Sequence, residues 1–96
     1  MTREEILNMP AGREMDSLVA ALVTKAEFPH DVYKFSTDIA DAYDAVEAVY
    51  KMGLEKRYVV SLCAVMVHDF GKTSLSKEYH ANAHQQARAA LLAVFA

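Results

Sequence analysis

The sequence predicts an α+β domain in which helices pack on a small antiparallel sheet, in helix–sheet–helix layers. Segments with the 3.6-residue apolar period of helices occupy both ends of the chain. Between them, residues 57–70 are enriched in β-branched and aromatic side chains, a composition that favours strands. Helices segregated from strands along a chain indicate an antiparallel sheet. The 96 residues suffice for one domain, residues 1–96, in the order of three helices, two or three strands and a last helix.

Capping and periodicity predict the first two helices. Thr2 and Glu5 have the T-x-x-E spacing of a capping box, which predicts a short helix at the start of the chain. A second helix is expected to begin near Pro10, because proline is well tolerated in a first helical turn. The apolar residues that follow recur at helical spacing: Met15, Leu18, Val19, Leu22 and Val23.

A third helix is predicted after a connector. Residues 28–35 hold three aromatic side chains, a proline and a histidine without a helical period. Ser36 is a favourable N-cap, and Asp38 in the first turn suits the helix dipole. Gly53 is the expected residue after the helix end. The residues expected to be buried on this helix are Ile39, Tyr43, Val46, Val49 and Tyr50.

The predicted strands come next. Because residues 57–70 would make an unusually long strand for so small a domain, we expect one bent strand or two short ones. Gly71 and Lys72 predict a turn, and a further strand is expected within residues 73–79. Asn82 then caps a last helix, whose apolar stripe is Ala83, Ala87, Ala90, Leu91 and Val94.

Composition narrows the class of protein. The formal net charge is −3, and the ten lysines and arginines are interleaved with acids, which makes a nucleic-acid surface unlikely. The longest strongly apolar run, residues 58–67, is well short of the roughly 20 residues of a membrane span. The N-terminal charges are followed by no apolar stretch, so no signal peptide is expected. A single cysteine, Cys63, fits a reducing, cytoplasmic setting.

Three blocks of sequence carry a family resemblance. They are residues 3–20, residues 36–47 and residues 88–94. Together they resemble the phage ABA sandwich domain, a family of small phage and prophage proteins. The resemblance implies helix–sheet–helix layering and a phage or prophage origin, so that the cytoplasm would be that of the host cell, but it implies no settled activity and no established catalytic residues. Residues 57–80 depart from the family pattern, since the chain has no tryptophan.

A second motif points to a different class. Residues 68–72 read His-Asp-Phe-Gly-Lys, which is similar to the H-D-x-G-K signature of HD-domain phosphohydrolases, where the His-Asp pair binds a metal. Those enzymes need another aspartate downstream, and none follows Asp69. His80 and His84 have the spacing of two zinc ligands but lack a third. We therefore expect no metal, no cofactor and no enzymatic activity, and interpret His68-Asp69 as a strand end before a turn.

The start of the third helix is the predicted ligand site. Aromatic faces, a cation and two hydroxyls precede or open this helix, whose free N–H groups can hold a phosphate or carboxylate. Arg88 on the last helix is expected to add a polar contact. The predicted ligand-binding residues are Tyr33, Lys34, Phe35, Ser36, Thr37 and Arg88.

These observations support hypotheses from different classes. The first is a non-catalytic phage protein that binds and sequesters a small anionic, nucleotide-like host signal and so acts against host defence. The alternative is a protein-interaction module that inhibits or adapts a host protein. A double-stranded RNA-binding module and the HD-type phosphohydrolase rank lower. A homo-oligomer is expected because the alanine-rich core is thin and Leu92 and Phe95 lie off the stripe of the last helix.

Overall fold

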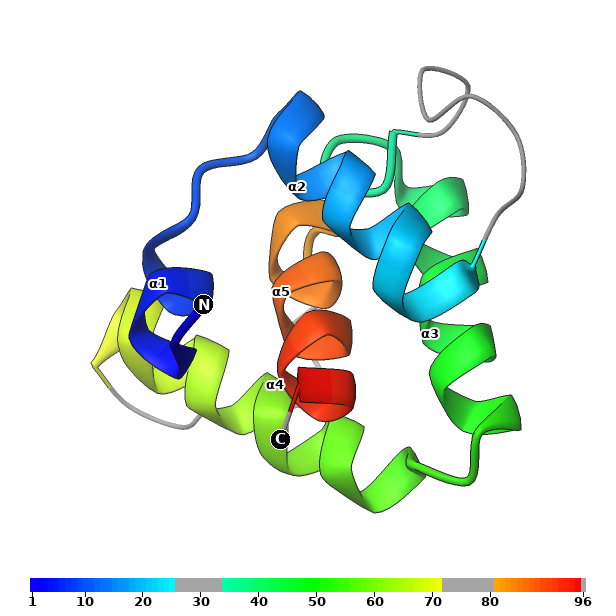
Figure 1. Cartoon of the computed structure of the whole chain (residues 1–96). Helices are drawn as coiled ribbons and strands as arrows, with labels where there is room; N and C mark the ends of the chain where they lie inside the picture. The colour runs from blue at the N-terminus through cyan, green and yellow to red at the C-terminus, as the bar shows by residue number, and fades with distance from the viewer. Residues whose placement is uncertain (26–33, 72–80, 96) are drawn as a thin grey trace.

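The structure, a computed structural model, describes residues 1–25, 34–71 and 81–95, and in these ranges it is entirely helical (Figure 1). A π-helical turn, η1, continues the second helix without a break. The elements are α1 (Arg3–Asn8), α2 (Arg13–Val19), η1 (Ala20–Thr24), α3 (Ile39–Lys51), α4 (Glu55–Phe70) and α5 (Ala83–Phe95).

The predicted α+β class is wrong, because residues 57–70 form most of helix α4 instead of strands. Its buried residues, Tyr58, Ser61, Val65 and Met66, follow helical spacing. The helix propensities of β-branched residues lie only a few tenths of a kcal/mol below those of good helix formers, roughly 0.5 kcal/mol per residue, so packing overrides them. The sheet layer that the family resemblance implies is likewise absent from the described ranges.

Gly71 does end this segment, but as the left-handed C-cap of a helix. Its φ of 74° is one that glycine adopts without strain, and its N–H donates to the carbonyl of Val67. Lys72 and the strand predicted within residues 73–79 lie outside the described residues.

The capping predictions at the two chain ends are confirmed. Thr2 Oγ1 accepts the N–H of Glu5, whose carboxylate accepts the N–H of Thr2. At the start of α5, Asn82 Oδ1 accepts the N–H of Gln85, and Gln85 Oε1 accepts the N–H of Asn82. Each box satisfies two N–H groups that a helix start would otherwise leave without acceptors.

The third helix differs from its prediction in cap and in face. Asp38, not Ser36, is the N-cap, with its carboxylate accepting the N–H groups of Ala40 and Asp41. Gly53, at a φ of 77°, follows the C-cap as predicted. Ile39, Tyr43 and Tyr50, predicted to be buried, are exposed, and the buried face is formed by Ala42, Ala45 and Val49.

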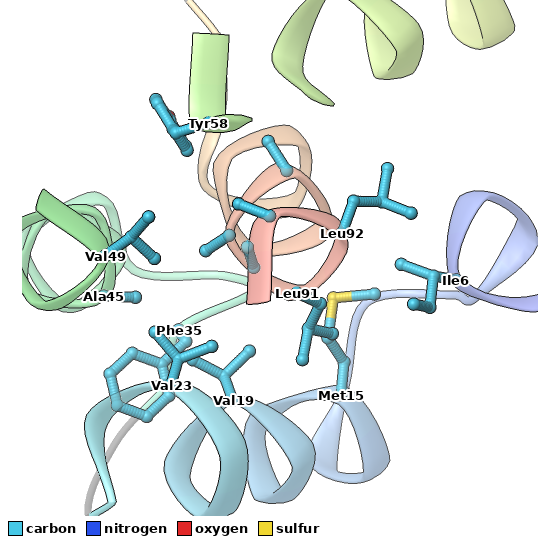
Figure 2. Packing of buried hydrophobic residues seen from close by; sticks show 14 of the residues in the cluster. Ile6, Met15, Val19, Val23, Phe35, Ala45, Val49, Tyr58, Leu91 and Leu92 are labelled. Carbon is cyan, nitrogen blue, oxygen red and sulfur yellow. The ribbon is translucent and has the colours of Figure 1, made fainter. Parts of the chain in front are cut away.

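Helix α5 is the centre of the fold. It lies between α1, α2 with η1, α3 and α4, and contacts each of them (Figure 1). Nearly all its residues are buried, including Leu92, which lies off the predicted apolar stripe, whereas Phe95 is exposed. Figure 2 shows Leu91 and Leu92 among the side chains of Ile6 and Met15. The many alanines of α5 allow its neighbours to approach closely, and the buried polar residues of its first half, Gln85 and Arg88, are hydrogen-bonded to α4.

Candidate functional site

The His68-Asp69 motif lies at the C-terminal end of α4, and its carboxylate faces α5. Arg88 Nη1 donates to Asp69 Oδ1 at 2.9 Å, and Arg88 Nη2 donates to Asp69 Oδ2 at 2.6 Å. Gln85 Nε2 donates to Oδ2 at 3.0 Å. The Arg88 side chain is 3% exposed and that of Asp69 is 21% exposed. This is a two-point charge-assisted pair, the strongest type of side-chain hydrogen bonding.

The same cluster holds the end of α1 against α5. Arg88 Nη1 also donates to the carbonyl of Leu7 at 2.8 Å, and His84 Nε2 donates to the carbonyl of Met9 at 2.7 Å. His68 places its two ring nitrogens 3.1 Å from Asp69 Oδ1 and 3.0 Å from Asn8 Oδ1. Polar side chains from three helices therefore satisfy one another and two helix-end carbonyls.

This geometry gives the motif a structural role. The hydrogen bonds from Arg88, assisted by those from Gln85 and His68, hold the pKa of Asp69 well below its usual range against the opposing effect of partial burial. Both carboxylate oxygens already face a guanidinium, which would repel a metal ion. Among the described residues, no group of three or more His, Cys, Asp or Glu side chains has the arrangement of a metal site. His80 lies outside these residues.

The predicted ligand residues are mostly engaged in the fold. Phe35 is fully buried in the hydrophobic core, so its ring offers no face to a base. Ser36 Oγ is buried; it donates to Asp16 Oδ1 at 2.7 Å and accepts the N–H of Gly12 at 2.9 Å. Arg88 is held by Asp69. Tyr33 lies outside the described residues.

The remaining two, Lys34 and Thr37, are exposed but stand beside acidic groups. The N–H of Lys34 donates to Asp41 Oδ2 at 2.8 Å, and the first N–H groups of α3 are capped by Asp38. An anion at this helix start would have to displace one carboxylate and approach another. The acidic groups of Asp38 and Asp41 therefore neutralise the positive end of the α3 dipole, and the start of α3 offers no electropositive site to an anion.

A cavity of about 230 Å³ between α1 and the first two turns of α4 has a different character. Lys56 and Arg57 come from α4 and Arg3 from α1, with Val60 and Ser61 completing the wall. A second hollow beside it, of about 490 Å³ and equally open to solvent, is lined by Thr2, Arg3, Glu4 and Leu7 and shares Arg3. Three cationic side chains therefore meet around one space.

The polar groups of this cavity have few partners. Arg3, Lys56 and Arg57 form no ion pair within 4.0 Å among residues 1–25, 34–71 and 81–95. Ser61 is only 6% exposed, yet within these ranges its hydroxyl makes no hydrogen bond. A hydroxyl that lines a cavity without a protein partner is a group that a ligand can satisfy.

Sequence reasoning did not find this cavity. Arg3 is far from Lys56 and Arg57 along the chain, and the predicted strand over residues 57–70 would point neighbouring side chains to opposite faces. The usable signal is helical spacing. On a helix, Arg57 and Ser61 are one turn apart, and so are Lys56 and Val60.

Helix α4 also has an apolar outer face. Val59, Val60, Val67 and Phe70 are 45% to 65% exposed, and the half-buried Cys63 lies among them. Figure 1 shows α4 along one edge of the bundle. Single exposed apolar residues are ordinary, whereas several along one helix face indicate a contact surface.

No family model, no curated protein and no solved structure matches this chain. Within the described residues, no helix combines the length and the hydrophobicity needed to cross a membrane.

Proposed function

We propose that this protein binds a small phosphate-bearing anion in the cavity between α1 and α4. The observation that carries the proposal is the convergence of Arg3, Lys56 and Arg57 on a cavity lined also by Ser61, whose hydroxyl has no protein hydrogen-bond partner in the described part of the chain. Cations supply charge-assisted hydrogen bonds to phosphate oxygens, and a serine hydroxyl supplies one more donor.

The charge around the cavity favours an anion even though the chain is acidic as a whole. Glu4 and Glu55 are sequence neighbours of the cationic residues, yet neither carboxylate lies within 4.0 Å of their charged groups. Cations without a carboxylate partner keep their charge and their donors for a ligand. The local potential, and not the net charge, determines what a small site binds.

The start of α4 adds to this potential. Its N-cap, Leu54, offers no side-chain acceptor, in contrast to Asp38 at the start of α3. The first-turn N–H groups of α4 therefore have no side-chain cap, and the positive end of the helix dipole lies at the end of α4 that lines the cavity. Helix starts of this type are common sites for phosphate.

The size of the cavity limits what it can enclose. A volume of about 230 Å³ is below the roughly 300–1,000 Å³ of sites that enclose a whole drug-sized ligand. The cavity suits the phosphate of a nucleotide-like molecule, whose remaining part would lie against Val60 and the surface of α4. Capture of such a ligand requires binding groups only, which is consistent with a non-catalytic protein that sequesters it.

Calorimetric titration tests this assignment, first with inorganic phosphate and then with cyclic dinucleotides and ADP-ribose. Charge-assisted hydrogen bonds contribute about 1.5–3 kcal/mol each, so Arg57→Gln should weaken binding by about tenfold or more. Lys34→Gln is the matched control, because it removes an exposed cation at the start of α3, away from the cavity. Its affinity should equal that of the unmodified protein.

Two outcomes would contradict the proposal. If none of the phosphate compounds binds, the cavity is not an anion site. If Lys34→Gln weakens binding and Arg57→Gln does not, the ligand lies at the start of α3. Ser61→Ala gives a further check, since it should weaken binding less than Arg57→Gln does.

A further inference from the structure

We propose that the outer face of α4 pairs with the same face of a second copy of this chain, antiparallel, with Cys63 on the two-fold axis. The face is defined here as Val59, Val60, Cys63, Val67 and Phe70, and is called the α4 face. It is the longest run of exposed apolar residues on a single helix in the described part of the chain. No residue within it carries a charge.

The arrangement of the α4 face is self-complementary. Val59 and Val67 stand four residues before and after Cys63, and Lys56 and Phe70 stand seven residues before and after it. In a two-fold contact, residue i of one copy meets residue j of the other, and j meets i. An antiparallel pair centred on Cys63 therefore brings each Val59 to the partner's Val67.

Helix geometry allows this contact. Val59, Cys63 and Val67 form an i, i+4, i+8 ridge, and such ridges interdigitate in the commonest class of helix packing. The side chains at the crossing point are valine and cysteine, which are small enough for close approach. The contact is centred on the middle of α4, where Cys63 is half-buried in the single chain.

Charge also favours a second, antiparallel copy. The basic residues Lys56 and Arg57 lie in the first turn of α4, so pairing places them near the negative dipole end of the partner helix. A parallel pair would instead bring the four basic side chains together.

The area of the α4 face predicts a weak dimer. It offers four exposed apolar side chains per copy, whereas stable interfaces have roughly 20–30 residues a side. We therefore expect a weak dimer whose population depends on protein concentration.

The dimer also bears on the cavity, and this part rests on the proposed function. Lys56 and Val60 both line the cavity. Val60 belongs to the α4 face, and Lys56 adjoins it. The partner's Phe70 would therefore lie at the cavity rim. Because the ligand and the second copy would both contact Val60, each would change the affinity of the other by the same factor.

Sedimentation velocity over a concentration series, without ligand, tests the dimer by itself. Val67→Glu should raise the dissociation constant at least tenfold, because it places a charge in an apolar contact. Tyr43→Glu is the matched control, since it puts the same charge on an exposed residue of α3. Val60→Lys repeats the test should Val67→Glu fail to fold, as judged by circular dichroism.

Crosslinking tests the antiparallel register. In a Cys63→Ala background, a chain with Val59→Cys mixed with one bearing Val67→Cys should crosslink through a short bismaleimide, whereas either chain alone should not. A monomer at all concentrations, a dimer disrupted by Tyr43→Glu only, or crosslinking of Val59→Cys to itself would each overturn the proposal. A dimer that binds no phosphate compound would leave the interface standing and contradict the proposed function alone.

Discussion

Arg88 of α5 donates hydrogen bonds to both carboxylate oxygens of Asp69 at the end of α4, with Nη1–Oδ1 and Nη2–Oδ2 distances of 2.9 and 2.6 Å. The two residues are 19 apart in sequence, and their pair links α4 to α5. Since Arg88 also binds the carbonyl of Leu7, the guanidinium joins α1, α4 and α5.

Removing this guanidinium should destabilise the protein strongly. Arg88→Met keeps much of the apolar stem but removes the guanidinium from the Asp69 carboxylate, which keeps only Gln85 and His68, and from the Leu7 carbonyl. Breaking a buried ion pair from one side costs about 3–5 kcal/mol, and the partial exposure of Asp69 places the expected loss near 3 kcal/mol. Urea denaturation measures it.

The control for this change is Lys51→Met, which removes an exposed ion pair with Glu47 at 3.4 Å. Such pairs contribute about 0.5 kcal/mol or less. Equal losses for the two variants would show that Arg88 and Asp69 are not paired in solution.

The stability of the protein should fall in acid through Asp69. Its pKa in the folded chain lies below its ordinary value of 3.8 because the ionised form is bound by Arg88. The stabilisation is therefore complete above the unfolded pKa and is lost as pH falls from about 5 toward the folded pKa. Asp69→Asn lacks this titration, so the difference in unfolding free energy between the two proteins should shrink from pH 6 to pH 3. A difference that stays constant over this range would contradict the assignment.

The buried contact between Ser36 and Asp16 should contribute to stability and not to binding. The N–H and the Oγ of Ser36 both donate to Asp16 Oδ1, at 2.8 and 2.7 Å. Ser36→Ala removes one of these donors from a buried carboxylate and should cost about 1–3 kcal/mol of unfolding free energy. Thr37→Ala, next to it and exposed, should change stability by less than about 0.5 kcal/mol. If thermal unfolding shows the same shift for both, the Ser36 contact is not formed.

Local signals in the sequence are sufficient for the starts of the first and last helices. The boxes formed by Thr2 with Glu5 and by Asn82 with Gln85 act within one turn, so they can be recognised without knowledge of the fold. The stripe of the second helix is partly correct. Met15, Val19 and Val23 are buried, whereas Leu22 is exposed because the π-helical turn changes the angular spacing of its residues.

Helix α4 could not be recognised in the same way. Its valines lie on both sides, with Val65 buried and Val59 exposed, so they give no one-sided helical period. A composition rich in β-branched residues then favours strand, and only packing against α5 decides otherwise. The ion pair of Asp69 with Arg88 depends on that packing, so the sequence suggested a metal motif and a ligand contact in place of one structural pair.

The end of the π-helical turn offers a test of backbone strain. Lys25 has φ and ψ of 54° and 39°, the left-handed conformation, and is the only described residue other than glycine with a positive φ. This conformation costs a residue with a Cβ about 1 kcal/mol, whereas glycine adopts it freely. Lys25→Gly should therefore raise the unfolding free energy by about 0.5–1 kcal/mol, even though glycine has more freedom to lose on folding. Glu47→Gly, in the interior of α3, is the control of opposite sign and should lower it by about 1 kcal/mol. Urea denaturation of both variants decides the matter, because equal destabilisation would show that Lys25 does not adopt the left-handed conformation in solution.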